Sequence, residues 1–75
     1  MIEVIIDSVF VGGKSLYKKF YDKGVIFEIW VSTHGKTPLL NKEVTVKSID
    51  CEYHREINSI NFDCYKQAID FLFNK

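Results

Sequence analysis

Residues 25 to 33, VIFEIWVST, alternate in a way that predicts a β-strand. β-branched and aromatic side chains, which strands favour, fill the segment. Because successive side chains in a strand point to opposite faces, the alternation defines two sets. One face would carry Val25, Phe27, Ile29 and Val31, and the other Ile26, Glu28, Trp30 and Ser32. The charge of Glu28 indicates that the second face reaches water.

A second strand is predicted from Ile2 to Val11, which is rich in β-branched residues and bounded by Gly12 and Gly13. A two-residue Gly-Gly connection suits a type I′ or II′ hairpin, because glycine adopts positive φ without a steric cost. The chain is therefore expected to turn back on itself directly after Val11.

The segment from Ser15 to Lys23 fits two periods. As a helix, Leu16 would pair with Phe20 and Tyr17 with Tyr21 at a spacing of four. As a strand, Leu16 and Phe20 would face one side, with Tyr17, Lys19 and Tyr21 on the other. Both flanking turns are typical of hairpins, Asp-Lys-Gly on the C-terminal side included, and they favour the strand.

The second half of the chain predicts one interrupted strand and a helix. From Glu43 to about Ile57 the alternation shifts by one residue, which predicts a bulge or break near Lys47 and Ser48. Asn61 is the expected N-cap of the final helix. Its apolar stripe at helical spacing comprises Phe62, Tyr65, Ile69, Leu72 and Phe73.

These elements predict a single α+β domain over residues 1–75. It would be an antiparallel β-meander of three or four strands with a C-terminal α-helix packed on one face. The alternative is a β-α-β-β-α order with a short helix at 15–23. In either case one helix covers one side of the sheet, so Ile26 and Trp30 would lie on the other side.

Composition and charge exclude several classes of protein. Of 75 residues, 47% are hydrophobic, so a folded core is expected rather than disorder. The formal net charge is zero, which argues against a general binder of nucleic acid or membrane surfaces. No apolar run approaches the roughly 18 residues of a membrane span, and a cytoplasmic protein with two reduced thiols, Cys51 and Cys64, is expected.

No motif predicts catalysis, a metal or a cofactor. GGKS, residues 12 to 15, ends like a phosphate-binding loop, but Ser8 stands where that loop needs its first glycine. The Cys and His residues, His34, Cys51, His54 and Cys64, contain one close pair, whose spacing of three places its members on opposite faces of a strand. A hairpin turn and ordinary thiols and imidazoles are the simpler interpretations, and a non-enzymatic protein is predicted.

Two binding hypotheses follow from the aromatic residues. The leading one is a protein-interaction module, with self-association as one form, and its contact residues would be Ile26, Trp30, Tyr17, Tyr21 and Phe71. Trp30 would then be partly exposed in the free monomer. The alternative is binding of single-stranded nucleic acid or RNA, with bases stacked on aromatic rings and phosphates paired with lysines. Its residues would be Lys14, Tyr17, Lys18, Lys19, Tyr21, Lys23 and Trp30.

Overall fold

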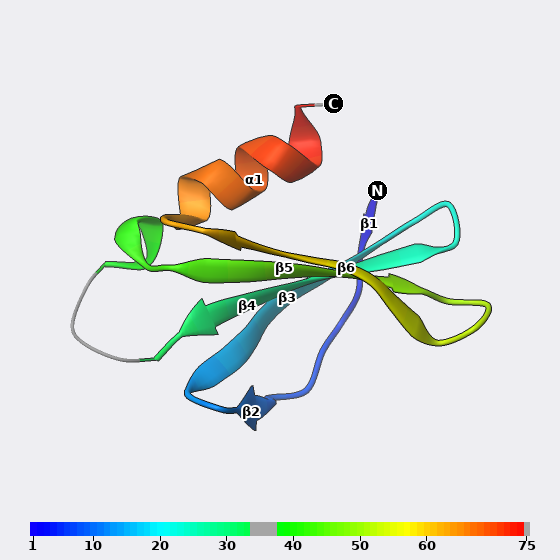
Figure 1. The fold of residues 1–75 in the computed structure, drawn as a ribbon, viewed down its shortest axis with the longest axis horizontal. Coiled ribbons are helices and arrows are strands. Elements are labelled where there is room, and N and C mark those ends of the chain that lie inside the picture. The colour runs from blue at the N-terminus through cyan, green and yellow to red at the C-terminus, as the bar shows by residue number, and fades with distance from the viewer. Residues whose placement is uncertain (34–37, 75) are drawn as a thin grey trace.

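A computed structural model describes residues 1–33 and 38–74. Within these residues six strands form one antiparallel sheet, and a single α-helix follows the last strand (Figure 1). The α+β class is as predicted, with more strands than the three or four expected. The elements are β1 (Ile2–Glu3), β2 (Phe10–Val11), β3 (Lys14–Asp22), β4 (Val25–Ser32), the 3-10 helix η1 (Leu39–Asn41), β5 (Val44–Asp50), β6 (Arg55–Phe62) and α1 (Tyr65–Phe73).

The strands from β3 to β6 form a meander in which each pairs with the next along the chain. β1 and β2 both pair with β3, at opposite ends of it: Ile2 lies opposite Tyr21, and Val11 opposite Lys14. The predicted strand from Ile2 to Val11 is therefore interrupted. Neither α1 nor η1, the helices of the described residues, has the length and hydropathy of a membrane span.

The interruption falls beside a bulge in β3. Leu16 pairs with Trp30 and Lys18 with Ile29, so Tyr17 is an extra residue in the ladder. The amide of Val4 donates to the Lys19 carbonyl at 2.8 Å, and the Leu16 amide donates to the Val9 carbonyl at 3.0 Å. A bulge disrupts the ladder locally and bends its strand. The N-terminal segment accordingly leaves β3 between these two hydrogen bonds.

Both predicted hairpin turns are confirmed. Gly12 and Gly13 have φ of 58° and 78°, and Lys23 and Gly24 have φ of 49° and 83°. Two successive positive φ values match the twist of the flanking strands. Residues 14–22 between these turns form a strand, so the alternative with a helix at 15–23 is wrong.

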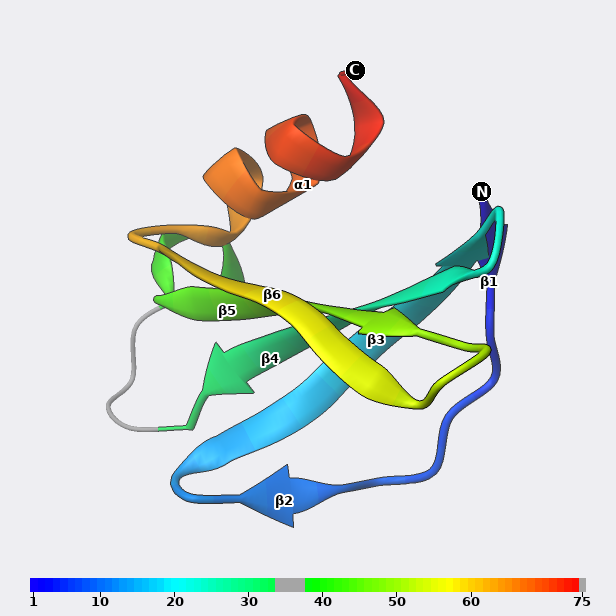
Figure 2. The same cartoon turned by 45° about the vertical axis from the view of Figure 1, so that its right-hand side comes forward.

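The core lies between one face of the sheet and α1 (Figure 2). Phe27, Ile29 and Val31 of β4 are buried there, as the alternation predicted. The bulge corrects the expectation for β3, because it places Phe20 in this core and Leu16 on the opposite face. The remaining buried members are Val44 and Val46 of β5 with Ala68 and Leu72 of α1.

The helix begins later than predicted. Its N-cap is Cys64 rather than Asn61, and Phe62 belongs to β6, where it pairs with Val44. The strand continues past Asn61 because β5 offers it a full set of partners up to Val44. Of the predicted apolar stripe, Leu72 is buried and Tyr65 and Ile69 pack against the core, whereas Phe73 is 50% exposed. Phe62 also packs against the core, but from β6.

The bulge or break predicted near Lys47 and Ser48 is found in the pairing of β5 with β6, where the register shifts between Ser48 and Ile49, and not in β5 itself. Its pairing with β4 runs without a shift from Val44 to Asp50. The extra residue is Ile57 of β6, since Ser48 pairs with Asn58 and Ile49 with Glu56. The apparent slip in alternation arises because residues 51 to 54 form the turn between β5 and β6 rather than more strand.

Candidate functional site

The face of the sheet opposite α1 is termed the open face. Paired residues of antiparallel strands share a face, so the register assigns its members. Trp30 lies between Leu16 and Thr45, and Thr45 lies next to Asn61. The other members used below are Lys14, Lys19, Tyr21, Ile26, Glu28, Lys47 and Ser59.

Trp30 is buried on this face, contrary to the prediction that it would be partly exposed. Its exposed fraction is 9%. The Lys47 ammonium lies over the indole, 5.3 Å from the ring centroid, and the indole Nε1–H donates to Glu28 Oε1 at 3.2 Å. Glu28 Oε2 is also 3.7 Å from Lys19 Nζ. Neighbouring side chains of the sheet therefore cover the ring and satisfy its N–H without a partner protein.

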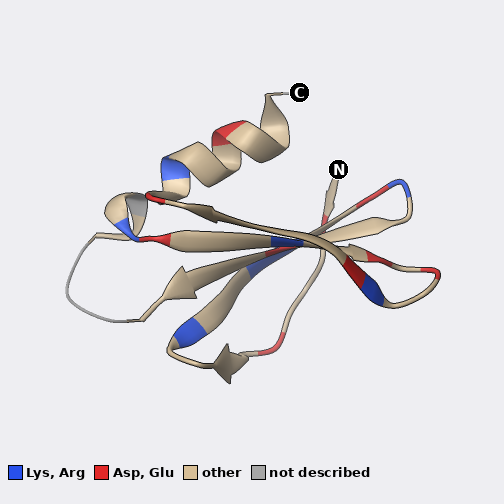
Figure 3. Cartoon of the chain, viewed as in Figure 1, with Lys and Arg blue, Asp and Glu red and all other residues tan. Residues whose placement is uncertain are grey.

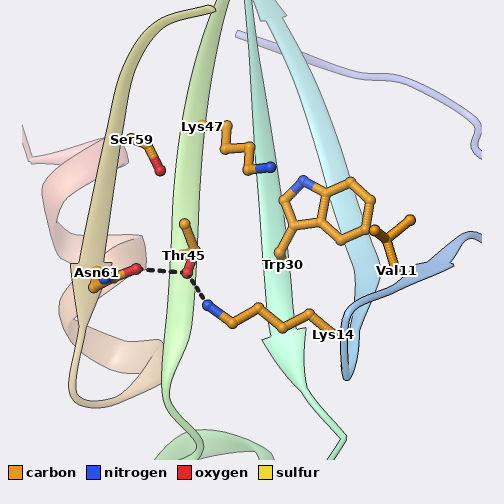
Figure 4. Close-up of a pocket in the computed structure, with 7 residues that line it drawn as sticks. All are labelled: Val11, Lys14, Trp30, Thr45, Lys47, Ser59 and Asn61. Atoms are coloured by element: carbon orange, nitrogen blue, oxygen red, sulfur yellow. Dashed lines mark hydrogen bonds between the residues drawn. The ribbon is translucent and has the colours of Figure 1, made fainter.

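A pocket of about 370 Å³ opens beside the indole (Figure 4). Lys14 Nζ donates to Thr45 Oγ1, and the Thr45 hydroxyl donates to Asn61 Oδ1 at 2.7 Å. Thr45 is 4% exposed, so this chain of hydrogen bonds holds the Lys14 ammonium against the buried surface of the sheet. The lining residues are Val11, Lys14, Trp30, Thr45, Lys47, Ser59 and Asn61, contributed by β2 to β6.

The pocket has a positive lining. Lys14 and Lys47 are its two charged residues, and no carboxylate lines it. Neither lysine forms an ion pair with a residue in the described part of the chain, where the ion pairs are Lys18 with Glu3 and Lys19 with Glu28. Elsewhere acidic and basic residues are interspersed along the ribbon (Figure 3). The positive charge is thus local to the pocket and is not a basic field of the whole protein.

The residues predicted to bind a protein do not form one surface. Ile26 and Tyr21 are cross-strand neighbours on the open face. Tyr17 lies on the helix side, where its ring meets Tyr65 of α1 edge to face at 5.5 Å. Phe71 lies on α1, 38% exposed, with its ring 5.4 Å from that of Phe62.

The predicted nucleic-acid residues are divided in the same way. Lys14, Lys19, Tyr21 and Trp30 belong to the open face, and Lys23 lies in the turn between β3 and β4. Lys18 and Tyr17 lie on the other side of the sheet, where Lys18 Nζ is 3.4 Å from Glu3 Oε1. The bulge accounts for the place of Tyr17 on the helix side, whereas Lys18 and Lys19 are consecutive residues of a strand and therefore point to opposite faces.

The aromatic cluster on the helix side changes the acidity of one hydroxyl. Burial raises the pKa of Tyr65, and the neighbouring Tyr17 hydroxyl adds to that rise. The Lys18 ammonium acts in the opposite direction. The neutral phenol is therefore the favoured form of Tyr65 in the folded chain.

Sequence reasoning missed five residues of the pocket: Val11, Thr45, Lys47, Ser59 and Asn61. Thr45 and Lys47 alternate with the buried Val44 and Val46, which is a signal for a shared polar face. That signal alone did not place them beside Trp30. Their position depends on the register between β4 and β5, in which Thr45 pairs with Trp30.

A second feature is the N-terminal apolar edge, defined as the exposed apolar residues of the first eleven positions. Ile5 is 99% exposed, and Ile2, Phe10 and Val11 are each more than 60% exposed. Met1 and Val9 complete the set. Of the described residues, no other segment of this length carries as many exposed large apolar side chains.

The thiols and the glycine motif have simple places in the fold. Cys51 and Cys64 are free and half-buried. Within residues 1–33 and 38–74 no group of three or more His, Cys, Asp or Glu side chains is arranged to hold a metal ion, and the candidate His34 lies outside the described residues. GGKS forms the turn between β2 and β3 and the first two residues of β3.

Comparison with known proteins found no similarity that assigns a function. No family model, curated protein or solved structure matches the chain. The pocket of the open face and the N-terminal apolar edge are therefore the two features of the structure that indicate a function.

Proposed function

We propose that the protein is a non-catalytic protein-interaction module that associates with a second copy of itself through the N-terminal apolar edge. The observation that carries this proposal is the exposure of Ile5, Phe10 and Val11 at 99%, 65% and 63%. Large apolar side chains on the surface of a small domain are typical of interaction sites, and here they lie on the outer strands β1 and β2 and the segment between them. Removing them from water favours association at about 25 cal/mol per Å² before the costs of ordering the interface.

This contact differs from the one that the sequence suggested. Trp30 cannot act as an exposed anchor, because it is 9% exposed and its N–H already has an acceptor in Glu28. Ile2 and Phe10 lie instead on β1 and β2, short strands that pair with β3 alone among the described strands. Their outer side is therefore open to a partner.

A second copy is the favoured partner on electrostatic grounds. The formal net charge of the chain is zero, so two copies meet without net repulsion. The edge itself carries Glu3 and Asp7, and Glu3 is already paired with Lys18. Little charge has to be removed from water when the apolar side chains of two copies meet.

Sedimentation velocity from micromolar to millimolar protein tests the proposal. The wild type should convert from monomer to dimer, and Ile5→Ser/Phe10→Ser should weaken dimerisation at least tenfold. Ile5 is 99% exposed and buries almost nothing in the monomer, so its substitution should leave the unfolding midpoint unchanged. Circular dichroism of each variant checks that point.

The matched control is Ile57→Ser/Tyr53→Ser. Ile57 and Tyr53 are 59% and 64% exposed and lie on β6 and in the turn before it, at the other edge of the sheet. This control should dimerise like the wild type. A wild type that stays monomeric throughout, or a control that is as defective as the Ile5 and Phe10 variant, would show that the N-terminal apolar edge is not the contact.

A further inference from the structure

The pocket of the open face presents hydrogen-bond donors that the described residues leave unused. An ammonium has three N–H donors. Lys14 uses one on Thr45, and Lys47 makes a ring contact with Trp30 but donates to no acceptor in residues 1–33 and 38–74. With no carboxylate in the lining, an anion in the pocket would meet two cations. Glu28, the register partner of Lys47, accepts from the Trp30 indole and is already paired with Lys19.

Phosphate suits this donor set. Lysine binds phosphate as a point charge with freely rotating donors, whereas planar carboxylates are matched by the arginine fork. Lys14 is held in place by the hydroxyl of Thr45, which is itself oriented by Asn61. The protein has thus already ordered one cation in the pocket, so less entropy is lost when an anion binds.

The other walls suit a flat ring with polar edges. In Figure 4 the indole of Trp30 lies between Val11 and Lys47, and an aromatic edge beside an aliphatic side chain forms an apolar wall. The Ser59 hydroxyl and the Asn61 Nδ2 donate to no described residue. Hydroxyl and amide groups of this kind recognise the edges of nucleobases. The volume of about 370 Å³ is within the range of small-molecule sites.

We propose that this pocket binds a nucleoside phosphate, with the phosphate on Lys14 and Lys47 and the base against Trp30 and Val11. The nucleotide is either free or one residue of a single strand. The site keeps Lys14 and Trp30 from the residues that the sequence suggested for nucleic acid and adds Val11, Lys47, Thr45, Ser59 and Asn61. Val11 belongs to both the pocket and the N-terminal apolar edge, but Ile5 and Phe10 do not line the pocket, so the Ile5 and Phe10 variant tests self-association without removing a pocket residue.

The test is a titration of the full chain followed by NMR of two side-chain N–H groups, Trp30 Nε1 and Asn61 Nδ2. Trp30 is the single tryptophan, so its indole signal is unambiguous. The probes are AMP, adenosine, inorganic phosphate and a short oligoadenylate. AMP should bind saturably and at least tenfold more tightly than adenosine or phosphate alone, because both halves of the ligand make contacts.

Charge-removing variants locate the phosphate. Lys14→Met and Lys47→Met keep most of the aliphatic stem, and each should raise the Kd for AMP at least tenfold. Lys66→Met is the matched control, since Lys66 is exposed on α1, away from the open face. Thr45→Val should weaken AMP binding as well by releasing Lys14, and thermal unfolding checks that each variant is folded.

The oligoadenylate distinguishes a free nucleotide from one residue of a single strand as the ligand of the pocket. If a strand is the ligand, the oligonucleotide should bind more tightly than AMP. With one phosphate held by the two lysines, its affinity should also fall about 2.6-fold when the salt concentration rises fourfold, since each neutralised phosphate contributes a slope of about −0.7 on logarithmic axes. Equal affinity of AMP and oligonucleotide assigns the site to a free nucleotide.

Three results would overturn the inference: the absence of any shift at Trp30 or Asn61 with every probe, equal binding of phosphate and AMP, or the same loss in Lys66→Met as in the pocket variants. Sedimentation behaviour of the Ile5 and Phe10 variant does not enter this test, so the two proposals fail independently.

Discussion

Replacing Trp30 tests whether the open face contributes to stability. The indole is 9% exposed, contacts the Lys47 ammonium and donates to Glu28. Trp30→Ala removes all three interactions and leaves a cavity, whereas Trp30→Phe keeps most of the apolar area and loses the N–H donor. The two variants therefore separate ring burial from the hydrogen bond.

The expected magnitudes follow from these contacts. Truncating a buried Trp to Ala costs about 3 to 5 kcal/mol. Loss of the hydrogen bond to Glu28 in Trp30→Phe should cost about 1 to 2 kcal/mol, because Glu28 keeps its contact with Lys19. A chain of 75 residues has a total stability on the order of 4 to 11 kcal/mol. Trp30→Ala should thus remove about a quarter or more of the free energy of unfolding.

Urea unfolding followed by far-UV circular dichroism measures the effect without relying on tryptophan fluorescence. With a slope near 1 to 2 kcal/mol/M, the midpoint of Trp30→Ala should fall by about 1.5 M or more. Lys47→Met, which removes only the contact over the ring, should cost about 0.5 to 1 kcal/mol. A Trp30→Ala midpoint within error of the wild type would refute the reasoning, since it would mean that the indole is exposed in solution.

Two further outcomes are expected from the helix side. Phe27→Ala should cost about 3 to 5 kcal/mol in the same urea assay, because Phe27 is 8% exposed and lies in the core. Ile5→Ala should change the free energy of unfolding by less than about 0.5 kcal/mol. Similar losses in both variants would contradict the assignment of Phe27 to the core. The pKa of Tyr65 is raised, so the folded chain holds the phenol proton more tightly than the unfolded chain. The contribution of Tyr65 to stability is therefore complete below pH 10 and declines as the pH rises above that value. Urea unfolding on either side of pH 10 should show a smaller loss for Tyr65→Phe than for the wild type, and equal losses would contradict the burial of this hydroxyl.

Local sequence patterns were enough to predict individual strands, turns and the apolar stripe of the helix. Alternation in residues 25 to 33 predicted β4 and its buried side, and the paired turn residues Gly12-Gly13 and Lys23-Gly24 predicted both hairpins. These features depend on backbone conformation and on a period of two, which neighbouring residues specify among themselves. The apolar stripe of the last helix was also predictable from local sequence, because it follows a period of 3.6 residues.

Where each strand begins, ends or bulges depends on its pairing with neighbouring strands. The bulge at Tyr17 exchanged the faces on either side of it, and the pairing of Phe62 with Val44 kept β6 extended past the expected N-cap. The stability of a bulge depends on how the bulged strand pairs with its partner strand, so no short window of sequence specifies a bulge. Expectations for Tyr17, Asn61 and Phe62 failed for this reason.

The candidate site was decided by register. Lys14, Trp30, Thr45 and Asn61 come from four strands and are 47 positions apart at the extremes, yet cross-strand pairing brings them to one pocket. The sequence indicated that Trp30 was distinctive, but its burial follows from Lys47 and Glu28, which the sheet places around the ring. Side-chain environment on a sheet is set by neighbours across strands, and those neighbours exist only once the sheet has formed.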